Sequence, residues 1–149
     1  MGSAPGNLAT MVSVQKSWSV DLPAEFGHAD VSEEITELVR DSGVTTGIVV
    51  VSLVGSTGAV TTIEYEPGAL ADLHRALAAI APREADYRHD ARWGDGNGFS
   101  HVRSAMLKTS ISVPIVDRAL QLGTWQQIVI LNLDNRDRNR QIVAVVVGE

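Results

Sequence analysis

The 149-residue chain contains no cysteine. This absence excludes disulfide bonds, catalytic thiolates and cysteine-ligated zinc. Any metal would have to be bound by histidine, aspartate, glutamate, asparagine or water. The chain has four histidines, and two of them, His89 and His101, lie in one polar stretch over residues 86–104.

Long apolar segments and clusters of basic residues are also missing. The longest apolar runs, such as residues 47–51, are far shorter than the roughly 20 residues that cross a bilayer. The first ten residues, MGSAPGNLAT, lack the basic segment and apolar core of a signal peptide. The net charge is −6 and most basic residues are scattered, which argues against nucleic acid as the main partner. We therefore expect a cytoplasmic protein that binds neither membranes nor nucleic acid.

The length and the apolar fraction of 44% are typical of one soluble domain with a real core. We expect a single domain over residues 1–149, with residues 1–10 as a flexible tail. Apolar residues alternate with polar ones in residues 12–20, which predicts a half-buried strand. The β-branched segments 44–54 and 59–65 predict two more strands, with a turn or bend between them.

Two segments have the pattern of amphipathic helices. Residues 30–43 offer Asp30 or Ser32 as an N-terminal cap and Gly43 as an end. Residues 67–82 have proline near the first turn and again after the last. His74 lies at the flank of the second helix's apolar stripe, where we interpret it as a packing or surface residue. The polar stretch 86–104 reads as a loop, and residues 101–107 as a short strand or a helical turn.

The C-terminal part predicts two strands, over residues 124–134 and 140–149, joined by NRDRN. Both are apolar on both faces, so both faces should be covered. One face can pack on helices, whereas the other needs a second sheet or another subunit. We therefore expect an α+β domain with a largely antiparallel sheet or sandwich and two main helices, completed by self-association. Trp125 and Gln126 are expected to be core and sheet residues.

Three stretches together resemble the YjbQ-like family, whose members are called secondary thiamine-phosphate synthases. They are SHVRSAMLKTSISVPIVD, LGTWQQIVI with the terminal VVVGE, and VGSTGAVTTIEYEPGALADL preceded by ADVSEEI. The resemblance extends from about Val12 to Glu149. It implies a compact domain that assembles as a homotrimer, with polar pockets near the subunit contacts and a site gathered from three histidines with acidic and amide neighbours.

The resemblance transfers to this chain position by position. His89 and His101 match two of the three family histidines, whereas Gly55 stands where the third imidazole is expected. Lys108 also departs from the family, which usually has a glycine before TS. The remaining matched positions are Ser56, Thr57, Glu64, Asp72 and Asn97.

Each of these residues also has a plainer interpretation. Glu64 and Asp72 could be a strand-end acid and a helix-start acid, and Asn97 could occupy a left-handed turn position between two glycines. Arg103 could bind a phosphate through two hydrogen bonds or be a solvated strand residue, and Ser110 could donate to a bound anion. We expect His89, His101, Glu64 and Asp72 to act in catalysis and Asn97, Arg103, Ser56, Thr57 and Ser110 to bind substrate.

Three functions are compatible with these residues. The first is thiamine phosphate synthesis, even as a side activity, in which an aminopyrimidine diphosphate and a thiazole phosphate are joined and pyrophosphate is released. The second is non-catalytic binding of a small anion or metal by a trimer, which the loss of the imidazole at Gly55 favours. The third is metal-assisted phosphoester hydrolysis. A divalent metal, Mg²⁺ or Zn²⁺, would be bound by His89 and His101, and the ligand would be a small phosphorylated molecule.

Overall fold

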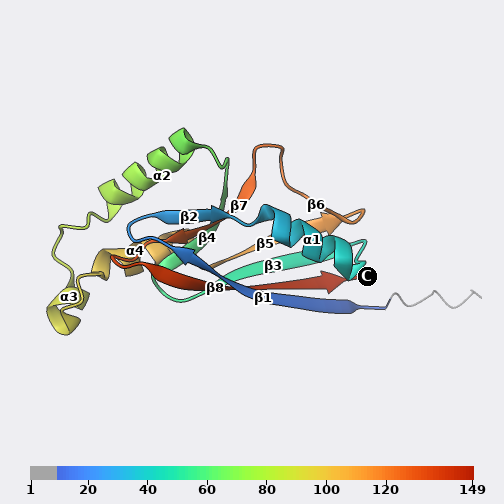
Figure 1. Ribbon diagram of the computed structural model, residues 1–149, viewed down its shortest axis with the longest axis horizontal. Coiled ribbons are helices and arrows are strands. Elements are labelled where there is room, and N and C mark those ends of the chain that lie inside the picture. The colour runs from blue at the N-terminus through green and yellow to red at the C-terminus, as the bar shows by residue number, and fades with distance from the viewer. Residues whose placement is uncertain (1–9) are drawn as a thin grey trace, which may run out of the picture.

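The computed structural model describes residues 10–149. Except for Thr10, the expected N-terminal tail lies outside the described residues. Eight strands form two antiparallel sheets, and four helices accompany them (Figure 1). In the described range no helix is both long and apolar enough to span a bilayer.

The larger sheet has five strands in the order β1-β8-β3-β5-β6. Its long strands β1 and β8 pair along their whole lengths, so that Val12 lies opposite Gly148 and Leu22 opposite Arg138. The smaller sheet has three strands in the order β2-β7-β4. The strand bounds are β1 Val12–Leu22, β2 Gly27–Asp30, β3 Gly47–Val54, β4 Gly58–Ile63, β5 Ser110–Val116, β6 Ala119–Leu120, β7 Gln127–Asn132 and β8 Arg138–Gly148.

Four pairs of strands that follow each other without an intervening helix, β1–β2, β3–β4, β6–β7 and β7–β8, change sheets at their connections. The predicted C-terminal strands are therefore consecutive in the chain but do not pair with each other. An interpretation of these two strands as a C-terminal hairpin is wrong, because NRDRN is not a hairpin turn but connects one sheet to the other.

Four helices are present rather than the two expected: α1 Ser32–Ser42, α2 Pro67–Ile80, α3 Arg88–Trp93 and α4 Gly98–Leu107. The N-cap of α1 is Val31, which makes no side-chain cap, so the expectation of Asp30 or Ser32 at this position was wrong; Asp30 Oδ1 still accepts a hydrogen bond from the Ser32 amide (2.9 Å). The helix ends at Gly43, whose φ of 73° is left-handed, as expected. α2 has Pro67 in its first turn. The polar stretch 86–104 was interpreted as a loop because of its glycines and acids, but it contains α3 and most of α4. Residues 101–107, interpreted as a short strand or a helical turn, belong to α4.

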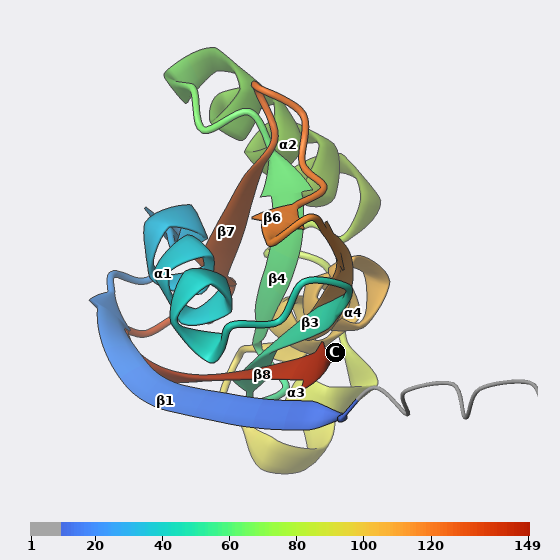
Figure 2. The same ribbon diagram turned by 90° about the vertical axis from the view of Figure 1, so that its right-hand side faces the viewer.

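The layers are visible in Figure 2, where β1 and β8 lie below, α1, β7 and β4 lie above them, and α2 lies at the top. One core cluster fills the space between the large sheet, α1 and the small sheet, with Ile35, Val49, Ile130 and Ile142 fully buried. A second cluster joins the other face of the small sheet to α2 through Leu70, Leu77, Val129 and Leu131. β7 is therefore covered on both faces, by a sheet and by a helix, as its apolar pattern predicts.

Candidate functional site

The two short helices α3 and α4 bring His89 and His101 together. Gly94 ends α3 with a φ of 68°, and Gly96 turns the chain again with a φ of 66°. The Gly98 amide, at the start of α4, donates to Asp90 Oδ1 on α3 (2.8 Å). The two imidazole centroids consequently lie 4.4 Å apart, with their planes inclined by 43°. The sequence grouped these two histidines correctly.

Two carboxylates, which the sequence did not single out, surround the His89 ring. His89 Nδ1 lies 3.2 Å from Asp95 Oδ1 and 3.5 Å from Asp90 Oδ1. These contacts lack hydrogen-bond alignment, and within the described part of the chain this buried nitrogen has no hydrogen-bond partner. Ligand atoms of the three half-buried residues lie within 4.8 Å of one another. Such a set of one imidazole and two carboxylates can bind a divalent cation. The signal in the sequence was the pair of acids that follows His89 in YRHDARWGD.

Asn97 connects this cluster to the sheets. Its side chain is 7% exposed and its φ of −119° is not left-handed, so the turn interpretation was wrong. In one orientation the amide nitrogen reaches Asp134 Oδ1 at 3.4 Å, and in the other it donates to Asp95 at 3.2 and 3.3 Å. Asn97 therefore orients carboxylates whichever way the amide faces. Asn135 adds two hydrogen bonds from its amide to the carbonyls of Asp95 and Gly96 (2.9 and 3.1 Å).

Beside His101 a pocket of about 530 Å³ opens between α4 and the β3–β4 connection. α4 contributes residues at helical spacings of three and four, which place them on one face. The connection contributes Gly55 and Ser56, so the position of the missing third imidazole does lie in the same pocket as His101. The full lining is Gly55, Ser56, His101, Ser104, Ala105, Lys108 and Thr109.

Thr57 points away from this pocket into a buried polar network. Its hydroxyl donates to Asp134 Oδ2 (3.0 Å) and accepts from Arg140 Nη2 (2.9 Å). Burial alone would raise the pKa of the Asp134 carboxyl, but hydrogen bonds from Thr57 and Arg138 outweigh burial, so this pKa lies below its ordinary value. Burial lowers the pKa of the Arg140 guanidinium. The network holds the two sheets together next to the pocket.

Other predicted site residues are not gathered at His89 and His101 within one chain. Glu64 follows the end of β4 that is remote from Ser56, and Asp72 is exposed on α2, where it pairs with Arg75 (2.7 Å). Ser110 is exposed at the start of β5, opposite Ser52. Whether these three residues act in catalysis or binding stays a prediction.

Arg103 and Trp125 differ from their expected surroundings. Arg103 is a buried residue of α4, 4% exposed, rather than a solvated strand residue. Its Nε donates to the Ala81 carbonyl (3.0 Å), its guanidinium covers the Phe99 ring at 4.8 Å, and burial lowers its pKa. Trp125 is 72% exposed in the loop before β7, and Gln126, also exposed, donates to Thr62 Oγ1 (3.1 Å). The core expectation failed because apolar character does not distinguish a loop tryptophan from a buried one.

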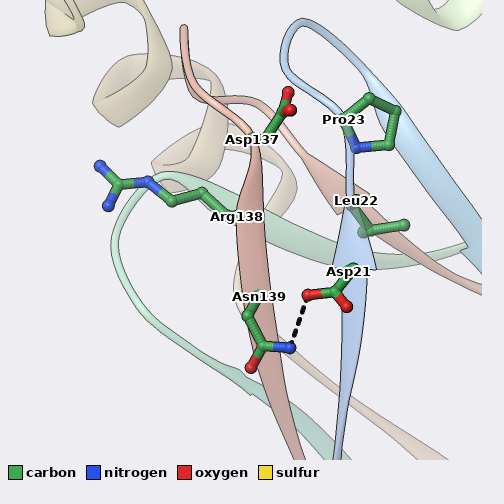
Figure 3. Close-up of a pocket in the computed structure, with 6 residues that line it drawn as sticks. All are labelled: Asp21, Leu22, Pro23, Asp137, Arg138 and Asn139. Carbon is green, nitrogen blue, oxygen red and sulfur yellow. Dashed lines mark hydrogen bonds between the residues drawn. The ribbon is translucent and has the colours of Figure 1, made fainter.

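A second pocket, of about 500 Å³, lies where β1 and β8 end (Figure 3). Its polar groups are already engaged in the fold. Asn139 Nδ2 donates to Asp21 Oδ1 (2.8 Å), and Asp137 Oδ1 accepts from the Ala24 amide (2.8 Å). The Arg138 guanidinium points away from Asp21 and binds Asp134 (2.8 Å). The pocket beside His101 is therefore the better candidate for ligand binding.

Comparison with known proteins identifies the relatives of this chain. The model of the family described as UPF0047 protein YjbQ-like matches residues 16–149. A UPF0047 protein of Methanothermobacter thermautotrophicus is 35% identical over 120 residues, which cover 80% of this chain and 82% of that protein. A UPF0047 protein of Synechocystis is 36% identical over 121 residues, with coverages of 79% and 81%.

Solved structures show the same fold. A protein of unknown function from Sulfolobus solfataricus superposes with a TM-score of 0.89 at 24% identity, covering 94% of this chain and all of that one. A hypothetical protein from Aeropyrum pernix superposes with a TM-score of 0.83 at 26% identity, covering 91% of this chain and 99% of that one. The expected α+β class with antiparallel sheets is confirmed.

Proposed function

The chain belongs to the UPF0047 YjbQ-like family, and from this premise we propose that it binds a small phosphorylated ligand together with a divalent cation. The observation that carries the proposal is the adjacent pair His89–His101, whose ring centroids lie 4.4 Å apart. One imidazole is surrounded by carboxylates, and the other faces a pocket with a lysine at its rim. The cation and the ligand would thus be neighbours.

The residues around His89 suit a divalent cation. A buried imidazole nitrogen without a hydrogen-bond partner, 3.2 and 3.5 Å from two carboxylate oxygens, is a costly arrangement unless a cation or a proton is shared among them. A set of imidazole and carboxylate ligands suits Zn²⁺ better than Mg²⁺, which prefers oxygen ligands alone. His89, Asp90 and Asp95 would bind the ion. When bound, it would supply positive charge beside the phosphates of the ligand.

The pocket suits an anion. Lys108 carries a positive charge, and the hydroxyls of Ser56 and Thr109 are hydrogen-bond donors for phosphate oxygens. The Ser104 hydroxyl is already used, because it donates to the Gly58 carbonyl (2.6 Å). The His101 ring can donate one further hydrogen bond from the wall of the pocket.

The reaction that best matches these groups is the formation of thiamine phosphate. The thiazole nitrogen would bond to the aminopyrimidine methylene carbon while the carbon–oxygen bond to diphosphate breaks and pyrophosphate leaves. His101 and Lys108 would bind the departing phosphates, and Asp90 and Asn97 would hold the cluster in place. Support for this particular reaction comes from the resemblance and from the anion-binding character of the pocket.

Non-catalytic binding is the second candidate, and one observation favours it. Gly55 has a φ of 143°, which disfavours a side chain, and an added Cβ would lie 3.2 Å from Arg140 Nη1. The backbone at this position is thus adapted to glycine, and a third imidazole is not accommodated. The hydrolase alternative has no observation of its own in its favour and stays a prediction.

The cation is tested by titrating chelator-treated protein with Zn²⁺ in a calorimeter. Wild type is expected to bind about one ion per chain, and Asp95→Asn to bind at least about 10-fold more weakly, since a charged ligand is lost. Asp41→Asn is the matched control, because Asp41 is an exposed acid that pairs with Arg40 on α1, outside the candidate site. Equal affinity in the Asp95 and Asp41 variants would remove the metal from the proposal.

The reaction is tested by incubating the protein with the aminopyrimidine diphosphate and the thiazole phosphate and measuring thiamine phosphate by chromatography. His101→Gln is expected to abolish product formation. His28→Gln is the control, because His28 lines a separate pocket with Phe26 and Tyr65. Substrate binding without any product would favour the non-catalytic candidate.

We also propose that the chain self-associates through the outer face of the large sheet, as the trimer that the resemblance implies. Part of this face is apolar and exposed, at Ile48, Val50, Val54 and Val116. The adjoining β8 side chains Val143, Val145 and Val147 are only half-buried. Within one chain the layers cover only the inner face of this sheet (Figure 2). Apolar strand faces of this kind are typical of protein interfaces.

A further inference from the structure

Lys108 has a backbone conformation that is essentially restricted to glycine. It follows α4 with φ 77° and ψ 159°. In this region the Cβ of any other residue is in steric conflict with its own backbone. A lysine in this strained conformation therefore points to a function of its side chain.

Backbone hydrogen bonds before and after Lys108 impose this conformation. The Lys108 amide donates to the Ser104 carbonyl (2.8 Å), and its carbonyl accepts from the Val60 amide on β4 (3.2 Å). The next carbonyl, of Thr109, accepts from the Leu53 amide on β3 (2.7 Å). Because α4 is fastened here to both sheets, the backbone cannot relax around the lysine.

The lysine faces the pocket that contains Gly55 and His101. The two positions at which the chain departs from its family resemblance, 55 and 108, therefore lie in one cavity. At position 55 a side chain is absent, and at position 108 a long cationic one is present. Among the described residues that line this pocket, Lys108 is the one lysine or arginine.

We propose that Lys108 binds the phosphate or diphosphate group of the ligand and takes over the contribution of the imidazole that Gly55 lacks. The inference rests on the proposed phosphorylated ligand and adds the residue that anchors it. The amine could also interact favourably with the C-terminal end of α4, but this is a weak surface effect that does not require the strained position. Binding a phosphate through a charged hydrogen bond does require this position, because the amine has to reach the space next to His101.

The experiment uses the unmodified protein first. The chain has two lysines, Lys16 and Lys108, and Lys16 lies on β1 beside Trp18. The protein is treated with a limiting amount of acetic anhydride, with and without inorganic pyrophosphate, and acetylation of each lysine is measured by mass spectrometry. Pyrophosphate is expected to slow acetylation of Lys108 several-fold and to leave Lys16 unchanged.

Three variants separate charge from strain. Lys108→Gln keeps the strain and removes the charge, so pyrophosphate affinity should fall about 10-fold or more while the melting temperature stays within about 1 °C. Lys108→Gly removes the charge and the strain, so affinity should fall equally while the melting temperature rises by roughly 2–12 °C. Lys108→Arg should keep most of the affinity. Lys16→Gln is the control and should match wild type in affinity.

The outcomes distinguish the two proposals. If pyrophosphate binds to wild type but neither protects Lys108 nor binds less well to the glutamine variant, the role of Lys108 is overturned while the ligand proposal stands. If pyrophosphate does not bind to wild type at all, both proposals fail. An unchanged melting temperature in Lys108→Gly would overturn the claim that lysine is kept against a conformational cost.

Discussion

Replacing Arg140 by methionine is expected to destabilise the protein strongly, although arginine is a charged residue in the interior. Arg140 is 5% exposed at the start of β8. Its Nη2 donates to the Thr57 carbonyl (2.8 Å), to the Thr57 hydroxyl (2.9 Å) and to Asn132 Oδ1 (2.5 Å). These acceptors belong to the β3–β4 connection and to β7, so the one guanidinium spans both sheets.

Two effects oppose each other in this substitution. Burying the guanidinium costs desolvation free energy, and removing the group recovers it. For this reason, replacing an entire buried ionic group by apolar residues is neutral or stabilising in some proteins. Here only one member is removed, so the Thr57 carbonyl and Asn132 Oδ1 lose a charged donor inside the core. Removing one partner of a buried network costs about 3–5 kcal/mol. At 2–4 °C per kcal/mol for a chain of this size, the melting temperature should fall by roughly 6–20 °C.

The assay is thermal and urea unfolding followed by circular dichroism. Arg136→Met is the matched control, because Arg136 is an exposed arginine in the connection between β7 and β8. Its effect on the free energy of unfolding should stay within about 0.5 kcal/mol. A double-mutant cycle with Thr57→Val should show a coupling of about 0.5–3 kcal/mol with Arg140→Met. If Arg140→Met melts at or above the wild-type temperature, desolvation exceeds the hydrogen bonds and our reasoning about the network is wrong.

Two further predictions concern pH and assembly. Burial, and then the charge of Arg103, lower the pKa of His74 below its ordinary value, so the unfolded chain binds this proton more readily than the folded one. The stability of wild type relative to His74→Gln should therefore decrease as the pH falls through about 6.5 and stop decreasing below the folded-state pKa. Urea unfolding midpoints of both proteins from pH 8 to 5 would show this difference, and parallel curves would contradict it. Val145→Glu places a charge on the outer face of the large sheet and should convert an oligomer to monomers in sedimentation velocity, whereas Thr36→Glu, exposed on α1, should not; a monomeric wild type at micromolar concentration would refute self-association.

Local patterns predicted much of the secondary structure for physical reasons. The alternation in β1, the end of α1 at Gly43 and the proline in the first turn of α2 are effects of near neighbours, and the structure contains all three. Glu66, which caps α2 by accepting from the Gly68 and Ala69 amides (2.7 and 2.8 Å), was missed, since glutamate is an uncommon cap. α3 and α4 were missed because glycines and acids outweigh helix-forming residues in residues 86–104.

The candidate site also combines residues that the sequence predicted with residues that only the structure identified. His89 and His101 could be grouped from their spacing and the resemblance, and Gly55 was recognised as a departure from the same pattern. Asp90 and Asp95 became candidates only when the turn between α3 and α4 placed their carboxylates around the His89 ring. Arg103 shared a predicted segment with His101 but faces the opposite side of α4, because residues two apart on a helix point in different directions.

The sequence by itself determined the absence of thiol chemistry, the α+β class and the existence of two apolar strands near the C-terminus, because these follow from composition and from contacts between near neighbours. The tertiary structure decided that β7 and β8 belong to different sheets, and it placed Lys108 and Gly55 in one pocket with His101. Which sheet a strand joins depends on pairing between residues far apart in the chain. Such long-range pairing has no local signature, and it is what brings the candidate binding residues together.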